Sequence, residues 1–150
     1  MSASATFTHR FTVRLHDTDA AGVMFYGHLF RHAHDAYEAF MTELGLPLAQ
    51  MVGAAQWHLP LVHAEADYEG AMRHGDEISI DLDVAHIGRS AFTLAYRFAG
   101  RDRRRLATAR TVHACVAPGD HTSLPLPREL REALSTCCRD TGDAGSAETQ

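Results

Sequence analysis

Cysteine, long apolar runs and positive charge are all scarce in this chain of 150 residues. Its three cysteines, Cys115, Cys137 and Cys138, are odd in number and two are neighbours, so neither a disulfide framework nor a CxxC zinc pair is indicated. No apolar run approaches the roughly 20 residues of a membrane span. Residues 1–6 lack the features of a signal peptide. We therefore expect a cytoplasmic protein without a membrane anchor.

The charge balance also restricts the partners. A formal net charge of -5 argues against a dedicated nucleic-acid binder, which would normally present a basic face. The dense basic cluster consists of Arg101, Arg103, Arg104 and Arg105, interrupted by Asp102. We interpret this cluster as a solvated hairpin turn, and a local patch for a phosphorylated ligand is the alternative.

Hydrophobic periodicity divides the chain into strands and helices. Residues 7–15 alternate strictly, so Val13 and Leu15 are expected on one buried face, and apolar residues at three- and four-residue spacing before Gly45 and Pro47 predict a long helix. In chain order we expect a strand at 7–15, a helix from 27 or 28 to 44, a short helical turn at 47–52, strands at 57–69, 77–86, 90–98 and 106–117, and a terminal helix at 127–139.

This order predicts an α+β fold in a single domain, residues 1–140, followed by a disordered tail at 141–150. Consecutive strands with short connections favour an antiparallel sheet, and the long helix must bury its apolar stripe against that sheet. Both sheet edges stay open, so pairing with a second copy is expected.

The loop at residues 16–22 offers the clearest chemistry. Asp17 and Asp19 precede a helix whose first backbone N–H groups are unpaired and carry partial positive charge. Such a helix start stabilises a developing oxyanion, and a neighbouring carboxylate attacks an acyl carbon or activates water. The alternative from composition alone is that both aspartates only cap turns and the helix.

A family resemblance favours a catalytic role over a capping role for this loop. From residue 11 to residue 127 the chain resembles the 4-hydroxybenzoyl-CoA thioesterase family of hot-dog-fold proteins, and most of all its branch acting on 1,4-dihydroxy-2-naphthoyl-CoA. The segments that carry the resemblance are DTDAAGV at 17–23, the aromatic pair at 25–26, HDAYE at 34–38, LPLVHA at 59–64, GD at 75–76 and GRS at 88–90.

The resemblance implies a hot-dog fold, in which a five-stranded antiparallel sheet wraps a long central helix. It implies an acyl-CoA thioesterase that needs no cofactor and works as a homodimer or homotetramer with its site at a subunit interface. Asp19 matches the catalytic carboxylate, and the backbone N–H of Tyr26 matches the oxyanion donor. Asp17 matches the aspartate that is more often structural, and the aromatic Tyr26 replaces the histidine of many relatives.

Further residues are candidates for substrate binding. Trp57, Leu59 and Phe25 suit an acyl pocket, with ordinary core as the alternative. His63 falls inside a resembling segment, and a core or interface histidine is equally consistent with it. Arg89 and Ser90 occupy the turn where the family places contacts to CoA, with a plain surface charge as the alternative for Arg89.

Other readings of the polar residues stay open. His28 and His32 are four apart on the helix, but a third metal ligand is not evident, so we expect no metal. A separate branch of the fold carries its carboxylate on the central helix, where Glu38 is the candidate here. The rival functions are a hydratase or dehydratase on the same fold and a non-catalytic acyl-CoA binding module.

Overall fold

The computed structural model describes residues 6–54 and 56–138. The predicted strand–helix–four-strand order is confirmed. The elements are β1 (Phe7–Thr12), the 3-10 turn η1 (Leu15–Asp17), α1 (His28–Glu43), α2 (Leu48–Ala54), β2 (Leu61–Tyr68), β3 (Glu77–Ile87), β4 (Ala91–Ala99), β5 (Arg105–Ala114) and α3 (Arg128–Ser135).

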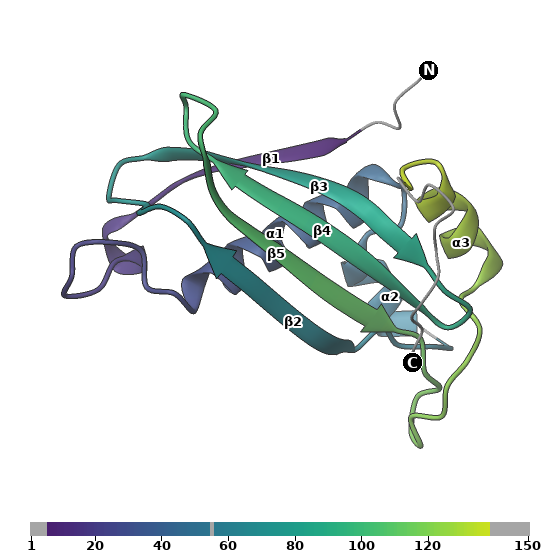
Figure 1. Ribbon diagram of the computed structural model, residues 1–150. Coiled ribbons are helices and arrows are strands. Elements are labelled where there is room, and N and C mark those ends of the chain that lie inside the picture. Colours follow the sequence, from purple (N-terminus) through teal and green to yellow (C-terminus); the bar gives the residue numbers. More distant parts are fainter. Residues whose placement is uncertain (1–5, 55, 139–150) are drawn as a thin grey trace.

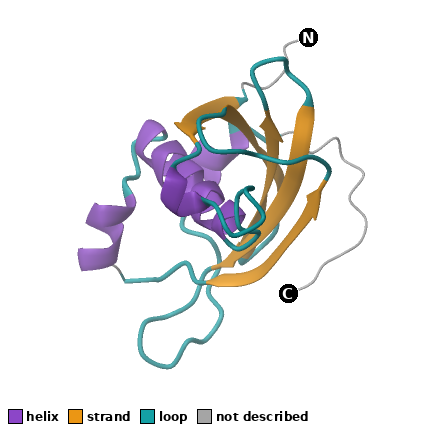
Figure 2. Ribbon diagram, turned by 90° about the vertical axis from the view of Figure 1, so that its left-hand side faces the viewer, coloured by secondary structure: helices purple, strands orange, loops and turns teal. Residues whose placement is uncertain are grey.

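The strands form one antiparallel sheet in the order β1-β3-β4-β5-β2, so β1 and β2 are its two edges. The sheet curves around α1, and the helices gather on its concave side (Figures 1 and 2). This is the expected hot-dog arrangement. β2 pairs only with β5, and its other edge is open within the described residues.

The core lies between α1 and the concave face of the sheet. The stripe of α1 is buried as predicted, with Leu29 and Phe40 at 0% and 1% exposure. On β3 and β4 every second side chain turns inward, which fits the two-residue period of a strand. The inward residues are Ile78, Ile80, Leu82 and Val84 on β3 and Phe92, Leu94, Tyr96 and Phe98 on β4.

The first strand is shorter than expected. Val13 is fully buried, but Leu15 is 69% exposed, so the prediction that both face the core is wrong. Thr12 pairs with Glu77, the first residue of β3, and the strand has no β3 partner beyond that point. The Arg14 N–H then donates to the Asp17 carboxylate at 2.8 Å, which turns the chain into η1.

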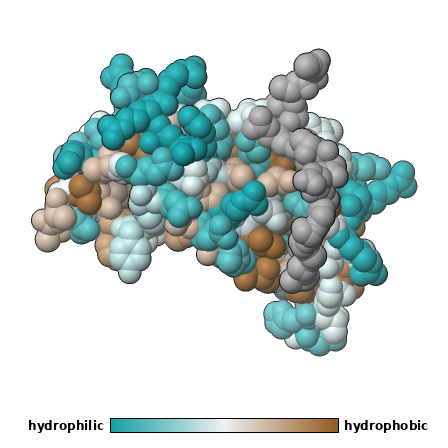
Figure 3. Space-filling view, in the orientation of Figure 1, coloured by the Kyte–Doolittle hydropathy of each residue, from teal (hydrophilic) through white to brown (hydrophobic). Residues whose placement is uncertain are grey.

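Two peripheral features complete the fold. The exposed arginine cluster lies on the β4–β5 turn, where hydrophilic side chains gather (Figure 3), as the interpretation of a solvated hairpin predicts. Helix α3 packs beside β3, and its Leu130 and Leu134 are fully buried. The expected tail at 141–150 lies outside the described residues. Of the described helices, none has both the length and the apolar character required to cross a bilayer.

Candidate active site

Residues 18–24 form a tight hairpin between η1 and α1. Thr18 bridges Met24, and the Asp19 N–H donates to the Val23 carbonyl at 3.0 Å. The Gly22 N–H donates back to the Asp19 carbonyl at 2.9 Å, and Gly22 has a φ of 83°. Glycine adopts this left-handed backbone without steric strain, whereas other residues are strained there, so Gly22 sets the shape of the hairpin.

Asp19 stands exposed in this hairpin. Its Oδ1 accepts the Ala21 N–H at 2.8 Å, which fixes the carboxylate over its own turn. No described residue donates to its Oδ2. The carboxylate is therefore oriented by the loop and still has an oxygen with free lone pairs for an incoming group.

Asp17, two residues earlier, is fully buried. Its carboxylate accepts hydrogen bonds from the Arg14 N–H and from Arg31, and His32 Nε2 lies 3.2 Å from its Oδ1. Burial by itself raises the pKa of Asp17, but the hydrogen bonds from Arg14 and His32 and the charges of His32 and Arg31 outweigh it and lower that pKa. Asp17 thus anchors the loop to α1, and its carboxylate is not exposed at the surface of the chain.

His32 is a structural residue of the same cluster. Its ring stacks on Phe11 with centroids 3.7 Å apart and planes 11° from parallel. Burial lowers the pKa of His32, although Asp17 acts in the opposite direction. Because Asp17 already engages its Nε2, pairing with His28 in a metal site is not supported. Within the described ranges, no three His, Cys, Asp or Glu side chains are placed to hold a metal ion.

The start of α1 leaves a backbone donor open beside the hairpin. The Phe25 N–H donates to the Asp17 carbonyl at 2.8 Å, and the Leu29 N–H reaches the Tyr26 carbonyl at 3.3 Å. The N–H of Tyr26 has no acceptor in the part of the chain that the structure describes. The side chains of Phe25 and Tyr26 are 39% and 68% exposed, and their rings lie 4.6 Å apart.

One residue at this site carries no signal in the sequence. The hydroxyl of Tyr68 donates to the Tyr26 carbonyl oxygen at 2.7 Å. Tyr68 is the last residue of β2 and lies 42 positions away from Tyr26 along the chain. Strand periodicity places Tyr68 beside Ala66 on one face, but it does not indicate that the hydroxyl reaches the start of α1.

The other candidate residues lie at the opposite end of the sheet. Trp57 and Leu59 precede β2, and Arg89 and Ser90 form the turn between β3 and β4, far from the hairpin that holds Asp19 (Figure 1). Strand β2, eight residues long, separates the two ends by about 25 Å at 3.3 Å per residue. A single chain therefore brings Asp19, Phe25 and Tyr26 together but leaves the other candidates apart from them.

Two of the other candidates, His63 and Arg89, have hydrogen-bond partners of their own. His63 Nε2 lies 2.8 Å from Glu65 Oε1, and both side chains are more than half exposed. The Arg89 carbonyl accepts the Leu126 N–H at 2.9 Å and an Arg131 N–H at 3.2 Å, while the Arg89 side chain is exposed. The C-terminal segment thus fixes the backbone of this turn, while the guanidinium of Arg89 has no partner among the described residues.

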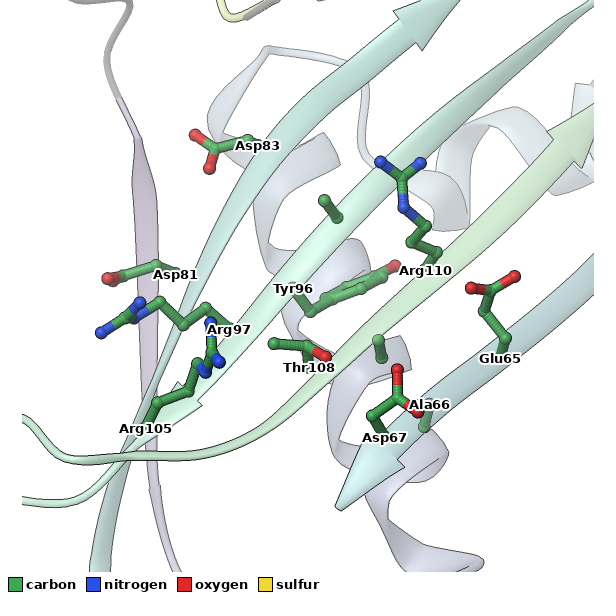
Figure 4. Close-up of a pocket in the computed structure, with 12 residues that line it drawn as sticks. Glu65, Ala66, Asp67, Asp81, Asp83, Tyr96, Arg97, Arg105, Thr108 and Arg110 are labelled. Carbon is green, nitrogen blue, oxygen red and sulfur yellow. The ribbon is translucent and has the colours of Figure 1, made fainter. Parts of the chain in front are cut away.

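A hollow of about 240 Å³ on the convex face of the sheet is not this site. Figure 4 shows Arg97 and Arg110 pointing to different sides of it, with Asp67 and Asp81 on its flanks. Arg105 of the arginine cluster lines it, but none of the residues named above as candidates for catalysis or acyl binding does, and α1 lies on the other face of the sheet. Its charged lining is also unsuited to an aryl or alkyl group.

Comparison with known sequences gives a consistent result. The family model of the thioesterase-like superfamily matches residues 13–134. A 1,4-dihydroxy-2-naphthoyl-CoA hydrolase from Synechococcus elongatus is 35% identical over 131 residues, which are 87% of this chain and 96% of that protein. The protein of the same name from Synechocystis is 31% identical and covers 86% of this chain and 94% of its own length.

Solved structures share the fold. The crystal structure of a 1,4-dihydroxy-2-naphthoyl-CoA thioesterase from Synechocystis superposes with a TM-score of 0.83 at 30% identity, covering 87% of this chain and 96% of that one. A DHNA-CoA thioesterase from Staphylococcus aureus superposes with a TM-score of 0.81 at 18% identity, covering 87% and 90%, and at that identity it supports the fold alone.

Proposed function

The chain belongs to the thioesterase-like superfamily, and on that basis we propose that it hydrolyses acyl-CoA thioesters at the hairpin that carries Asp19. The observation that supports this site best is the pairing of an exposed, loop-oriented carboxylate with a free backbone N–H at the helix start. Acyl transfer requires these two groups, a nucleophile or base and an oxyanion donor.

In the proposed reaction the carbonyl oxygen of the thioester accepts the Tyr26 N–H. The Asp19 carboxylate either attacks the carbonyl carbon or takes a proton from a water that attacks it. Negative charge grows on the carbonyl oxygen and is stabilised by that N–H and by the positive end of α1. The C–S bond then breaks, and CoA leaves as a thiolate that takes up a proton. When water is the attacking group, the acyl group is released directly as the carboxylic acid. When Asp19 attacks, an anhydride between Asp19 and the acyl group forms, and a water hydrolyses it to release the acid and restore the Asp19 carboxylate. A thioester is already activated, so the proposed reaction needs no cofactor.

For the acyl group we propose an aryl substrate of the 4-hydroxybenzoyl or 1,4-dihydroxy-2-naphthoyl type. Two relatives of at least 30% identity are named for 1,4-dihydroxy-2-naphthoyl-CoA. Phe25 and Tyr26 place two partly exposed rings beside the free N–H, and aromatic rings pack well against an aryl group. Trp57 and Leu59 are proposed to extend this surface.

We propose that two copies complete the site by pairing their open β2 edges. Leu61, Val62 and Tyr68 are each about half exposed along this edge, an unusual amount of apolar surface for a strand facing water. A twofold axis between two antiparallel β2 strands sets the Leu61 end of one copy beside the Tyr68 end of the other. Trp57, Leu59, His63, Arg89 and Ser90 of the second copy then approach Asp19, so the separation of about 25 Å within one chain is removed.

The same edge pairing gives a homodimer, and a homotetramer requires a further contact between two such dimers. None of the three cysteines forms a disulfide within the described residues, which suits a reducing compartment such as the cytoplasm.

The test is a thiol-release assay on the purified protein with 4-hydroxybenzoyl-, 1,4-dihydroxy-2-naphthoyl-, benzoyl- and straight-chain acyl-CoA. We expect release of free CoA from the aryl substrates with the highest kcat/KM. A hydratase would add water to an enoyl-CoA without releasing thiol. A binding module would retain acyl-CoA without turnover. Either of these two results would contradict the proposal.

A further inference from the structure

Tyr68 links the edge strand β2 to the residues just before α1 through a hydrogen bond. Its hydroxyl donates to the carbonyl oxygen of Tyr26 at 2.7 Å. Within one chain the ring is about half exposed, and the bond from its hydroxyl is the hydrogen bond that this side chain makes among the described residues.

This bond acts on the backbone around the free N–H of Tyr26. On one side of Tyr26, the Phe25 N–H is held by the Asp17 carbonyl at 2.8 Å. On the other side, the Tyr26 carbonyl is held by Tyr68. The peptide that carries the Tyr26 N–H thus lies between two anchored peptides, one tied to the buried loop and one tied to the sheet.

One further backbone bond fixes the helix start, from the His28 N–H to the Phe25 carbonyl at 2.9 Å. The cap residue is Gly27, which makes no side-chain cap hydrogen bond, and the first turn contains no acidic residue. The Leu29 N–H reaches the Tyr26 carbonyl only at 3.3 Å, near the long end of hydrogen-bond distances. Tyr68 therefore supplies the short contact that the cap residue does not.

We propose that Tyr68 is a positioning residue: its hydroxyl holds the Tyr26 carbonyl, and so limits the movement of the adjoining peptide whose Tyr26 N–H points at the oxyanion. This rests on the proposed thioesterase function. Oxyanion stabilisation depends on a donor that is already oriented before charge develops, because reorientation during the reaction costs free energy. Loss of the hydroxyl loosens the peptide without removing the donor, so its effect should fall on kcat and leave substrate affinity nearly intact.

The test compares Tyr68→Phe with Tyr96→Phe in the intact protein. Both variants keep the ring and lose one hydroxyl bond, and the Tyr96 hydroxyl lies 2.8 Å from Thr111 Oγ1 in the core, away from the hairpin. We expect Tyr68→Phe to lower kcat about tenfold with KM changed less than about twofold, which is smaller than the hundredfold or greater loss of a whole donor. We expect Tyr96→Phe to lower the Tm and keep kcat.

A second measurement does not depend on turnover. In the amide NMR spectrum of the substrate-free protein, Tyr68→Phe should shift or broaden the signals of Tyr26 and Gly27 and leave those of β3 unchanged. Full kcat in Tyr68→Phe overturns the proposal, whether or not these amides move. A lower kcat with unmoved amides overturns it as well, because Tyr68 would then act on the substrate directly. If the parent releases no thiol, the proposed function fails, and the amides still report whether Tyr68 holds the helix start.

Discussion

The Nε2 atom of His32 lies 3.2 Å from Oδ1 of Asp17, and this contact ties the buried side of α1 to the loop that presents Asp19. Asp17 and Asp19 belong to one short loop, yet one carboxylate is fully buried among donors and the other is exposed. The burial of Asp17 explains how an exposed carboxylate two residues later is kept in place.

Asp17→Asn should therefore destabilise the fold. The substitution removes the charge that Arg31 and His32 face, and we expect the free energy of unfolding to fall by about 2–3 kcal/mol. Urea unfolding at neutral pH measures this. Asp76→Asn is the matched control, because Asp76 also accepts a backbone N–H three residues earlier, from Arg73 at 2.8 Å, but lies exposed. Equal losses in the two variants would contradict the anchoring role of Asp17.

Stability should also fall in mild acid because of His113. Burial, with a smaller effect of His34, lowers the pKa of His113 to about 4 from 6.5. Between these values the unfolded chain binds a proton that the folded chain does not, so stability is lost as the pH falls through this window. From pH 7 to pH 5 we expect a loss of about 2 kcal/mol from this group.

The measurement for His113 is urea unfolding at pH 7 and pH 5 on the parent and on His113→Gln. The glutamine retains an amide that can bond Thr111, which lies 2.9 Å from His113 Nε2 in the parent, but it does not titrate. The loss of unfolding free energy between pH 7 and pH 5 should be about 2 kcal/mol smaller in the variant than in the parent. An unchanged dependence would show that His113 is not the titrating group.

The open β2 edge should control assembly. Val62→Glu places a charge on the proposed seam, where a like charge from the second copy opposes it, so we expect elution as a monomer in size-exclusion chromatography and loss of turnover. Leu15→Glu is the control, because Leu15 is also exposed, at 69%, but lies on η1 and not on the edge. A parent that elutes as a monomer and still turns over would contradict a site shared between copies.

The hairpin geometry can be tested at Gly22. Gly22→Ala should destabilise the protein by about 1 kcal/mol, because alanine is strained at a φ of 83°, and should lower kcat by displacing Asp19. Gly119→Ala imposes the same kind of strain at a φ of 95°, on a turn away from the hairpin that carries Asp19, and no atom lies within 4 Å of the added Cβ in either case. We expect similar Tm losses from both and a kcat loss only from Gly22→Ala.

Sequence periodicity predicted the centre of the sheet well because β3, β4 and β5 each bury one face. The alternating apolar residues from Ile78 to Val84 and the apolar stripe from Leu29 to Phe40 are both buried in the same core. The end of β1 was missed because alternation through Leu15 continues beyond the point where β3 offers a partner to pair with. How far a neighbouring strand extends is a property of the tertiary structure, and the sequence of a single strand does not indicate it.

The site was predictable in part. The resemblance indicated Asp19 and Tyr26 as candidates, and these roles stay predictions. It also indicated that Asp17 is structural, and the structure surrounds the Asp17 carboxylate with hydrogen-bond donors. Tyr68 was not predictable, because its contact with Tyr26 joins residues 42 positions apart through side chain and backbone. The separation of Arg89 from Asp19 within one chain could not be predicted from the sequence either, since it follows from the order of the strands.

The most direct test of the central claim is kcat for thiol release by Asp19→Asn on the best aryl-CoA. Asp120→Asn is the matched control, because Asp120 also bonds the backbone N–H two residues ahead, at 3.1 Å, and is exposed on another loop. We predict that Asp19→Asn loses about a thousandfold in kcat and keeps the parent Tm, while Asp120→Asn keeps its rate. A full rate in Asp19→Asn would contradict the assignment of Asp19 as the catalytic carboxylate.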